Sequence, residues 1–356
     1  MREQFNTETH ARLRVLLAIG YALFIVYASL SPFVGWREQG LDFFDVLNAP
    51  LRLTYTAFDA AINVLSYLPF GLLVTLTLRK YFGVPSSLLV GCCVGMLLSL
   101  GMEYVQMYLP VRISSNTDLL SNSLGAFFGA VIALSITSWT WLFETLISWR
   151  SYVFYQGKET DFGLALLALW MFGQINPSLP MLGNVFISET ARQPFVTLPI
   201  QQFDVWQASV VILNLLMLGT LMLTLLRISS KVVSALLIVL SMVVAVKFFA
   251  AAVLLKSWAM LLWINNEALL GILFGVAAVF LMVRWSWKTI VSFGAVVSVG
   301  YFVIINVVFS GNSPESAKPV YHWHYGHLLT YNGLAQTIAL VFPILLLFYF
   351  WRVRKI

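Results

Sequence analysis

Residues Val232–Leu254 read VVSALLIVLSMVVAVKFFAAAVL, and Lys247 is the only charged side chain among them. A helix needs about 20 mostly apolar residues to cross the hydrocarbon core of a bilayer. The apolar residues are continuous here, whereas a strand of a membrane barrel would alternate apolar and polar positions. This stretch therefore predicts a transmembrane helix, in which Lys247 either extends its ammonium toward the membrane surface or pairs with Glu267.

Apolar runs of similar length recur along the whole chain of 356 residues. Hydrophobic residues make up 60% of the sequence and charged residues only 10%, compared with about 25% charged residues in a soluble domain. We therefore predict an all-α, polytopic bundle of about ten transmembrane helices. The expected spans are residues 13–34, 60–78, 84–106, 119–143, 162–180, 205–226, 232–254, 259–283, 289–310 and 328–350.

The distribution of basic residues predicts the orientation of these helices. Of the 21 Lys and Arg residues, fourteen lie in the segments that include both termini and six in the segments on the opposite side. Because cytoplasmic segments carry the excess of basic residues, both termini are predicted to be cytoplasmic. The formal net charge of +6 then reflects this topology and an attraction to anionic lipid, and we expect no nucleic-acid partner.

The polar segment 148–161 is the predicted boundary, a cytoplasmic linker, and the sequence after it faintly repeats earlier motifs. Short segments correspond in the same order in both halves, namely 28–33 with 174–179, Asn63 with Asn214, and 122–126 with 332–335. Two explanations stay open, a degenerate parallel duplication and chance similarity among apolar segments. In a duplication, the seventh and eighth spans are an inserted hairpin. The ninth span lacks an acid equivalent to Glu103, so chemistry is expected in the first half.

Small residues and one proline indicate how the helices pack. Glycines four residues apart permit close contacts between helices, and the chain has three such pairs, Gly91 with Gly95, Gly125 with Gly129, and Gly271 with Gly275. Pro69 lies in the middle of the second span and predicts a kink there, because proline removes one helical hydrogen bond. We interpret both features as packing signals.

Six polar residues near the ends of the second, third and fourth spans form the candidate site. They are Asn63, Glu103, Gln106, Arg112, Asp118 and Asn122. Glu103 and Gln106 are three residues apart and so share one helix face. Asp118 and Asn122, four residues apart, do the same. The predicted topology places all six near the headgroups of the outer leaflet, where an ionisable group persists mainly if it is paired, lines a cavity or does chemistry.

These residue types are compatible with several roles. Arg112 could bind a phosphate or carboxylate through two parallel hydrogen bonds. Glu103 could act as an acid or base, or relay a proton, while the amides orient a ligand or hold the carboxylates. In the structural alternative, Arg112 forms a buried ion pair with Glu103 or Asp118. Asp118, together with Thr117, could also cap the start of the fourth span.

Three of the four histidines, His322, His324 and His327, lie in one loop that is predicted to be exported. Imidazoles at this spacing can converge on a metal ion, but no nearby carboxylate or cysteine completes a ligand set. Tyr, Trp and His are also common where a membrane protein meets the bilayer surface. We favour this second interpretation, and we predict no metal and no cofactor.

The site residues occur in an ordered series of motifs. These are Ser31-Pro32-Phe33, Asn63 with Leu68-Pro69-Phe70-Gly71, Glu103-x-x-Gln106, Pro110-x-Arg112, and Asp118-x-x-x-Asn122-x-x-Gly125-Ala126-x-x-Gly129. In this order they resemble the VanZ-like family of bacterial membrane proteins, whose namesake is associated with teicoplanin resistance. Some relatives carry another acid between the Arg and the Asp. Here Ser114-Ser115-Asn116 occupies that stretch, which argues against a two-carboxylate mechanism.

The resemblance covers about residues 13–143. It implies a four-span VanZ-like domain over residues 1–147. Beyond the linker it does not cover the six-span second half, residues 162–356, which hydropathy predicts, except through the faint repeat. It also implies a multi-pass protein of the bacterial inner membrane with a role in the cell envelope. It does not indicate the reaction, the ligand or the oligomeric state.

We predict that the protein binds an anionic amphiphile at the outer leaflet. The ligand would be a membrane lipid, a lipid-linked glycan intermediate of the envelope or a lipophilic antibiotic, the last of these implying glycopeptide resistance. Arg112 would contact the anionic headgroup, and the other five residues would shape the pocket. One alternative is an intramembrane enzyme acting on a lipid or glycolipid, with Glu103 as the catalytic acid or base. A secondary transporter is the other alternative, although the site lies on one side only.

Overall fold

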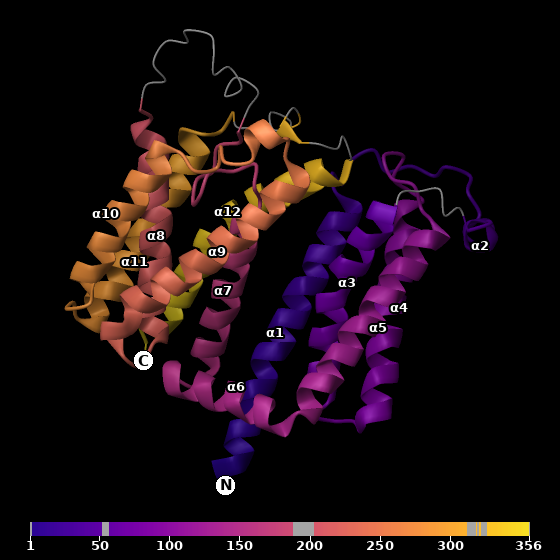
Figure 1. The fold of residues 1–356 in the computed structure, drawn as a ribbon, viewed down its shortest axis with the longest axis horizontal. Coiled ribbons are helices and arrows are strands. Elements are labelled where there is room, and N and C mark those ends of the chain that lie inside the picture. Colours follow the sequence, from indigo (N-terminus) through magenta and orange to yellow (C-terminus); the bar gives the residue numbers. More distant parts are fainter. Residues whose placement is uncertain are drawn as a thin grey trace. The chain divides into compact units, whose positions relative to one another are not determined.

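The computed structural model describes residues 2–51, 57–187, 203–311, 318, 320–321 and 326–355. Within these residues the secondary structure is helical, with twelve α-helices, two 3₁₀ turns and two isolated β-bridges but no sheet, which confirms the predicted fold class (Figure 1). The chain divides into two compact units, Met1–Ser151 and Tyr152–Ile356. We call them the first and second units. The proposed duplication of the two halves stays a prediction.

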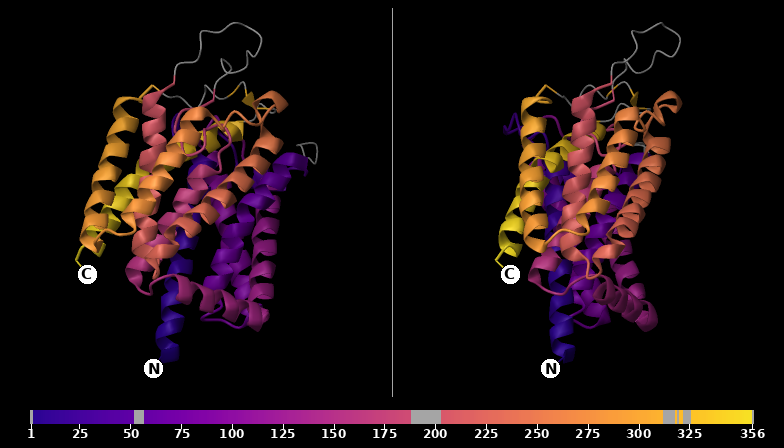
Figure 2. Two further views of the ribbon diagram at one scale, coloured as in Figure 1. Left: turned by 60° about the vertical axis from the view of Figure 1, so that its left-hand side comes forward. Right: turned by 90° about the vertical axis from the view of Figure 1, so that its left-hand side faces the viewer.

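The first unit is built from four long helices, α1 (Arg2–Leu30), α3 (Ala57–Leu78), α4 (Val84–Gln106) and α5 (Asn116–Ser138). Two short helices complete it, α2 (Phe43–Asn48) and α6 (Thr140–Val153), the last of which reaches the boundary. The most extensive contact joins α3 to α5, while α4 packs on α5 and α1 packs on α3. Figures 1 and 2 show these four long helices running side by side.

Helices α3 and α5 touch backbone to backbone, as the glycine pair in α5 predicts. A Cβ atom added to Gly129 would lie 2.0 Å from the carbonyl oxygen of Leu68, and one added to Gly125 would lie 2.3 Å from that of Val64. Gly71 of α3 meets the backbone of Ala126 in the same way. Helix α3 continues through Pro69 without a break. This close approach places the N-terminal turns of α3 beside the start of α5.

In the described part of the second unit there are six α-helices, namely α7 (Lys158–Gln174), α8 (Val205–Leu225), α9 (Val232–Leu254), α10 (Asn266–Met282), α11 (Trp287–Val307) and α12 (Gly326–Val353). Helix α8 is almost entirely buried, and α10 and α11 pack against it. Helix α12 packs on α7 and α11. Gly271 and Gly275 of α10 lie against the side chains of Val211 and Leu215, so this glycine pair also serves packing.

Polar side chains determine where several of these helices begin. The Asp204 carboxylate accepts hydrogen bonds from the backbone N–H groups of Trp206 and Gln207 at the start of α8. Asn265 accepts from the N–H of Ala268 at the start of α10, and the Ser286 hydroxyl accepts from the N–H of Thr289 at the start of α11. Each cap satisfies N–H groups that have no partner within the helix.

A non-helical stretch, residues 175–187, follows α7 and is almost completely buried. We call it the buried loop. The side chain of Asn332 on α12 accepts hydrogen bonds from Asn176 (2.8 Å) and Ser178 (3.0 Å) of this loop and from the Tyr321 hydroxyl (2.7 Å). Burial raises the pKa of Tyr321 to about 12, so its hydroxyl stays protonated and donates at neutral pH.

Among the described residues, eight helices are long and apolar enough to cross a membrane, compared with the ten predicted. The predicted span 162–180 is wrong at its end, because α7 has only 17 residues and stops at Gln174, before Pro177 and Pro180. The predicted span 259–283 starts too early, since α10 begins at Asn266 and also has 17 residues. The other eight predicted spans agree with the candidate spans to within a few residues. The predicted orientation of the termini stays a prediction.

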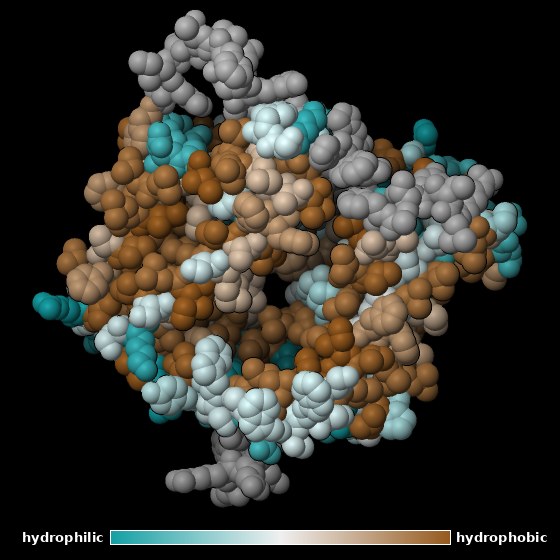
Figure 3. All heavy atoms as spheres, viewed as in Figure 1, coloured by the Kyte–Doolittle hydropathy of each residue, from teal (hydrophilic) through white to brown (hydrophobic). Residues whose placement is uncertain are grey.

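Apolar side chains cover most of the surface in Figure 3. Many large apolar residues on the candidate spans are exposed, among them Leu23 of α1, Leu97 of α4 and Phe249 of α9. Exposed apolar surface on this scale is unusual for a soluble protein, whereas it suits helices that face lipid. The chain is therefore a multi-pass membrane protein.

Candidate functional site

The six predicted site residues lie around the end of the first unit where α4 finishes and α5 starts. Asn63 belongs to α3, Glu103 and Gln106 belong to α4, and Asp118 and Asn122 belong to α5. Arg112 lies in the connection 107–115. Their hydrogen bonds separate them into two groups, one around the carboxyl groups and one at the end of α1.

Glu103 is buried, with 4% of its surface exposed, and its side chain meets the first turn of α5. Its Oε2 atom accepts a hydrogen bond from the backbone N–H of Ser115 at 2.8 Å. Ser115 is the N-cap of α5, and its own hydroxyl accepts from the N–H of Thr117. The cap predicted from Asp118 is therefore wrong, since Asp118 lies in the first turn instead. A helix N-terminus attracts negative charge, which favours a carboxylate at this place.

Asp118 brings a second carboxyl group next to Glu103. Its Oδ1 atom accepts a hydrogen bond from the side-chain amide of Asn63 at 2.8 Å, which joins α5 to α3. Asp118 interacts electrostatically with Glu103, and Asp59 of α3 is near enough to interact with Asp118. The structure therefore provides two neighbouring carboxyl groups from Glu103 and Asp118, although the acid present in some relatives is missing here.

Asn122 lies one helical turn further along α5 and is also buried. Its amide nitrogen donates to the hydroxyl of Ser99 on α4 at 3.0 Å. Its Oδ1 atom is buried and has no hydrogen-bond partner within the part of the chain that the structure describes. A buried acceptor without a partner is costly, so this oxygen marks a place where a donor group, such as a water or a ligand hydroxyl, would be favourable.

Ser99 and Tyr67 also belong to the cluster, although they are not among the six predicted site residues. Tyr67 lies close enough to Glu103 to affect it electrostatically. A spacing rule could have found both residues, because Tyr67 is four residues after Asn63 and Ser99 is four residues before Glu103. Residues four apart share a helix face, so these neighbours of the site follow from the helical assignment.

Arg112 and Gln106 hold the C-terminal end of α1. The Arg112 guanidinium donates to the carbonyl oxygen of Ser31 through Nε (3.1 Å) and Nη2 (2.7 Å), and Nη2 also donates to Ala28 O (3.0 Å). Gln106 donates to the carbonyl oxygen of Ser29 at 3.0 Å. The last carbonyl groups of a helix have no partner within it. The side chains of Arg112 and Gln106 provide hydrogen-bond donors for these carbonyl groups. Burial lowers the pKa of Arg112, but a guanidinium remains charged in proteins.

These contacts connect residues of the ordered motifs across the unit. Ser31 meets Arg112, Asn63 meets Asp118, and Glu103 meets the start of α5. Residues 3–142 match the model of the VanZ/LLP1 family. The resemblance drawn from the motifs is thereby confirmed for this part of the chain, which we call the VanZ/LLP1 segment. No curated protein and no solved structure matches the chain.

The connection 31–51 covers the Arg112 end of the VanZ/LLP1 segment. The Gln39 side chain donates to Met107 O at 2.6 Å, and the backbone N–H of Arg37 donates to Tyr108 O at 2.9 Å. Both this connection and the connection 107–115 carry exposed apolar side chains. They include Trp36, Phe44, Val111 and Ile113. Exposed apolar and aromatic residues next to the ends of spans are typical of the membrane–water interface, which supports a site at headgroup depth.

Among the described residues, no group of three or more His, Cys, Asp or Glu side chains is arranged to hold a metal ion. The weaker metal-site candidate, formed by His322, His324 and His327, lies outside the described residues, which include neither His322 nor His324 nor the side chain of His327.

Replacing Arg112 with Lys tests its role at the end of α1. Lysine keeps the charge but cannot reproduce the planar fork that reaches two carbonyl groups. We expect the ligand-free protein to lose about 1–2 kcal/mol of stability, measured as the shift in thermal unfolding of the purified protein. Arg37→Lys, at an exposed arginine of the same region, is the control and should leave unfolding unchanged. Equal stability of the two variants would mean that the capping contacts contribute little.

Proposed function

We propose that the VanZ/LLP1 segment binds the polar head of a membrane amphiphile at the cluster formed by Asn63, Glu103, Asp118 and Asn122. The observation that supports this proposal is the meeting of two carboxyl groups from α4 and α5 at the first turn of α5, beside the unpartnered Asn122 Oδ1. Ionisable residues within membrane helices are costly and are commonly functional. A place in the bacterial inner membrane and a role in the cell envelope belong to the same proposal.

The composition of the cluster favours a headgroup that donates hydrogen bonds. Carboxyl oxygens accept hydrogen bonds, and Asn122 Oδ1, which has no partner among the described residues, is also an acceptor. The hydroxyl groups of a glycan can donate to all of them. A bare phosphate would bring further acceptor oxygens next to those of Glu103 and Asp118, and Arg112 already donates to the carbonyl groups of Ala28 and Ser31. Among the predicted ligands, a lipid-linked glycan or a glycosylated lipophilic antibiotic therefore fits better than a simple anionic lipid.

The accessible part of the cluster is Asp118 with Asn63. Both are half-buried, whereas Glu103 and Asn122 are buried. We assign Asp118 and Asn63 to direct contact with the headgroup. Glu103 holds the first turn of α5 through Ser115, so it positions the residues that make contact. The exposed apolar residues of the connections 31–51 and 107–115 would lie in the same membrane surface as the lipid.

Asp118→Asn provides the test of this assignment. Asparagine keeps the size of the side chain but removes the charge that accepts from ligand hydroxyls. We expect affinity for a polyprenyl-linked disaccharide to fall about tenfold, measured by native mass spectrometry or ligand-induced thermal stabilisation. Polyprenyl phosphate without the sugar is the ligand control, and Asp45→Asn, at an exposed position of α2, is the protein control. The proposal is abandoned if Asp118→Asn binds the glycan lipid as well as the Asp45 variant does.

The same carboxyl pair also supports a second function, an intramembrane enzyme acting on a lipid or glycolipid. Neighbouring carboxyl groups in different surroundings can divide the roles of acid and base. In this case Glu103→Gln should abolish turnover of the glycan lipid and leave its binding intact, as followed by mass spectrometry of the lipid products. Turnover that survives in Glu103→Gln would exclude Glu103 as the catalytic acid or base.

A further inference from the structure

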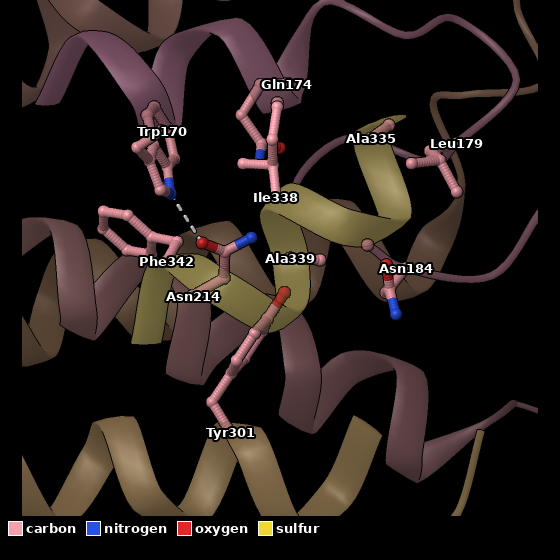
Figure 4. Close-up of a pocket in the computed structure, with 12 residues that line it drawn as sticks. Trp170, Gln174, Leu179, Asn184, Asn214, Tyr301, Ala335, Ile338, Ala339 and Phe342 are labelled. Carbon is pink, nitrogen blue, oxygen red and sulfur yellow. Dashed lines mark hydrogen bonds between the residues drawn. The ribbon is translucent and has the colours of Figure 1, made fainter. Parts of the chain in front are cut away.

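A small cavity of about 20 Å³ lies beside the buried loop of the second unit. A volume of this size holds about one water molecule. Figure 4 shows Trp170, Asn214 and Tyr301 beside it. Asn214 accepts a hydrogen bond from Trp170 Nε1 at 2.6 Å and donates to Leu182 O of the loop at 2.9 Å. We therefore interpret the cavity as part of the packing that supports the loop.

Helix α6 presents a different kind of surface, because it runs across the ends of the long helices of the first unit (Figures 1 and 2). None of its 14 residues is buried. Trp141, Thr145 and Trp149 recur at intervals of four residues and so share one face, on which the two tryptophans are 76% and 59% exposed. A helix of this length is too short to span a bilayer, and exposed tryptophans are typical of segments that lie in the membrane–water interface. This face is therefore suited to contact with lipid headgroups.

Helix α6 also meets Arg14 of α1. The Arg14 guanidinium lies over the Phe143 ring, with 5.3 Å between its central carbon and the ring centroid. Its Nη1 atom donates to Leu76 O near the end of α3 at 3.1 Å. Arg150 of α6 is close enough to interact electrostatically with Arg14. Both guanidinium groups stay charged, so they repel each other, and an anion placed between them would be stabilised.

Arg79 adds a third positive charge at the end of α3. It lies three residues after Leu76, and its Nη1 atom donates to Phe82 O at 3.0 Å. Its Nε atom is buried and has no hydrogen-bond partner among the described residues. Neither Arg14 nor Arg79 forms an ion pair with a described carboxylate. A buried donor without a partner is costly, so an acceptor that carries negative charge is favoured at this place.

We propose that α6 and these arginines bind an anionic phospholipid, with Arg14 and Arg79 contacting its phosphate. A guanidinium can donate two parallel hydrogen bonds to phosphate oxygens, and the phosphate offsets the repulsion between Arg14 and Arg150. Trp141 and Trp149 lie among the neighbouring headgroups. The positive charge of the site selects a lipid with net negative charge over a zwitterionic lipid. This site lies at the C-terminal end of α3, whereas the carboxyl cluster lies at its start, so it does not depend on the proposed function.

Arg79→Gln and Arg14→Gln test the contact with phosphate, because glutamine removes the charge. Binding of phosphatidylglycerol and of phosphatidylcholine to the purified full chain is measured by native mass spectrometry. We expect the dissociation constant for phosphatidylglycerol to rise about fivefold in each variant, since one basic residue contributes about that factor at an anionic surface. Phosphatidylcholine should bind as it does to the parent. Arg284→Gln, at an exposed arginine between α10 and α11, is the matched control and should keep the affinity of the parent for both lipids.

Trp141→Ala combined with Trp149→Ala tests the aromatic face separately. Neither tryptophan is buried, so the double variant should keep the melting temperature of the parent and bind both lipids more weakly. Phosphatidylglycerol affinity equal to that of the Arg284 variant in both Arg14→Gln and Arg79→Gln overturns the site. Inorganic phosphate that displaces phosphatidylglycerol at equal concentration overturns the assignment to a lipid, because the site would then recognise the free anion.

Discussion

Gly129→Ala should destabilise the first unit by about 3 kcal/mol, although it adds a single methyl group. The new Cβ would lie 2.0 Å from Leu68 O and 2.7 Å from Leu72 N. These are backbone atoms of α3, so no side chain can turn away to make room. Helix α5 must move from α3, and overpacking of this kind costs about 1–3 kcal/mol or more. That is a large part of the total stability of about 5–15 kcal/mol that a folded domain has.

Two native cysteines can report the unfolding of the first unit, and a second glycine in the same unit provides the control substitution. Its only two cysteines, Cys92 and Cys93, are free and lie in α4 of the same unit, so their reaction with a thiol-reactive fluorophore during heating follows unfolding of the first unit. Gly101→Ala makes the same chemical change in α4, where nothing lies within 4 Å of the added atom. It should be neutral or slightly stabilising, because alanine is the better helix former. Similar melting temperatures for the two variants would contradict the backbone contact.

Asn332→Leu should have a comparable effect on the second unit. Leucine has a similar volume but removes the oxygen that accepts from the Asn176 amide and from the Tyr321 hydroxyl at 2.8 and 2.7 Å. Among the described residues, the hydroxyls of Ser178 and Tyr321 then have only Asn176 Oδ1 as an acceptor, at 2.8 and 3.5 Å. Each buried donor without a partner costs about 1–3 kcal/mol, and these groups form one network, so we expect a loss of about 3 kcal/mol or more. Thermal unfolding followed by circular dichroism measures the loss.

Hydrogen exchange shows where the Asn332 substitution acts. Residues 175–187 should exchange faster in Asn332→Leu, because the loop loses its attachment to α12. Asn306→Leu is the matched control, since the Asn306 amide is exposed and its described hydrogen bond goes to Phe302 O on its own helix. If the loop exchanges at the same rate in the two variants, Asn332 is not what holds it.

Hydropathy predicts the long helices of this protein well because the membrane requirement acts on each segment separately. A run of about 20 apolar residues suffices to predict a span, and eight of the ten predicted spans correspond to helices of adequate length. The end of α7 was predicted wrongly. Asn176 and Ser178 leave the helical path there because Asn332, far away in the sequence, provides their acceptor.

Helical spacing also predicts part of the candidate site. The 3.6-residue period places Glu103 and Gln106 on one face and Asp118 and Asn122 on another, and the structure brings Glu103, Asp118 and Asn63 together. The contact of Arg112 with the end of α1 could not be predicted. Its acceptors are the carbonyl oxygens of Ala28 and Ser31. Every residue has a backbone carbonyl group, so the sequence does not indicate which of them Arg112 contacts.

The sequence by itself determined that Val232–Leu254 and similar runs are membrane helices, and that the polar residues of the first half lie near the span ends. Both conclusions follow from local chemistry and a fixed helical period. Only the tertiary structure decided which partner each polar group has. Lys247 reaches two carbonyl groups of the buried loop instead of the membrane surface or Glu267. The reason is physical: in a membrane a polar group must find its partner within the protein, and the fold determines which groups are near.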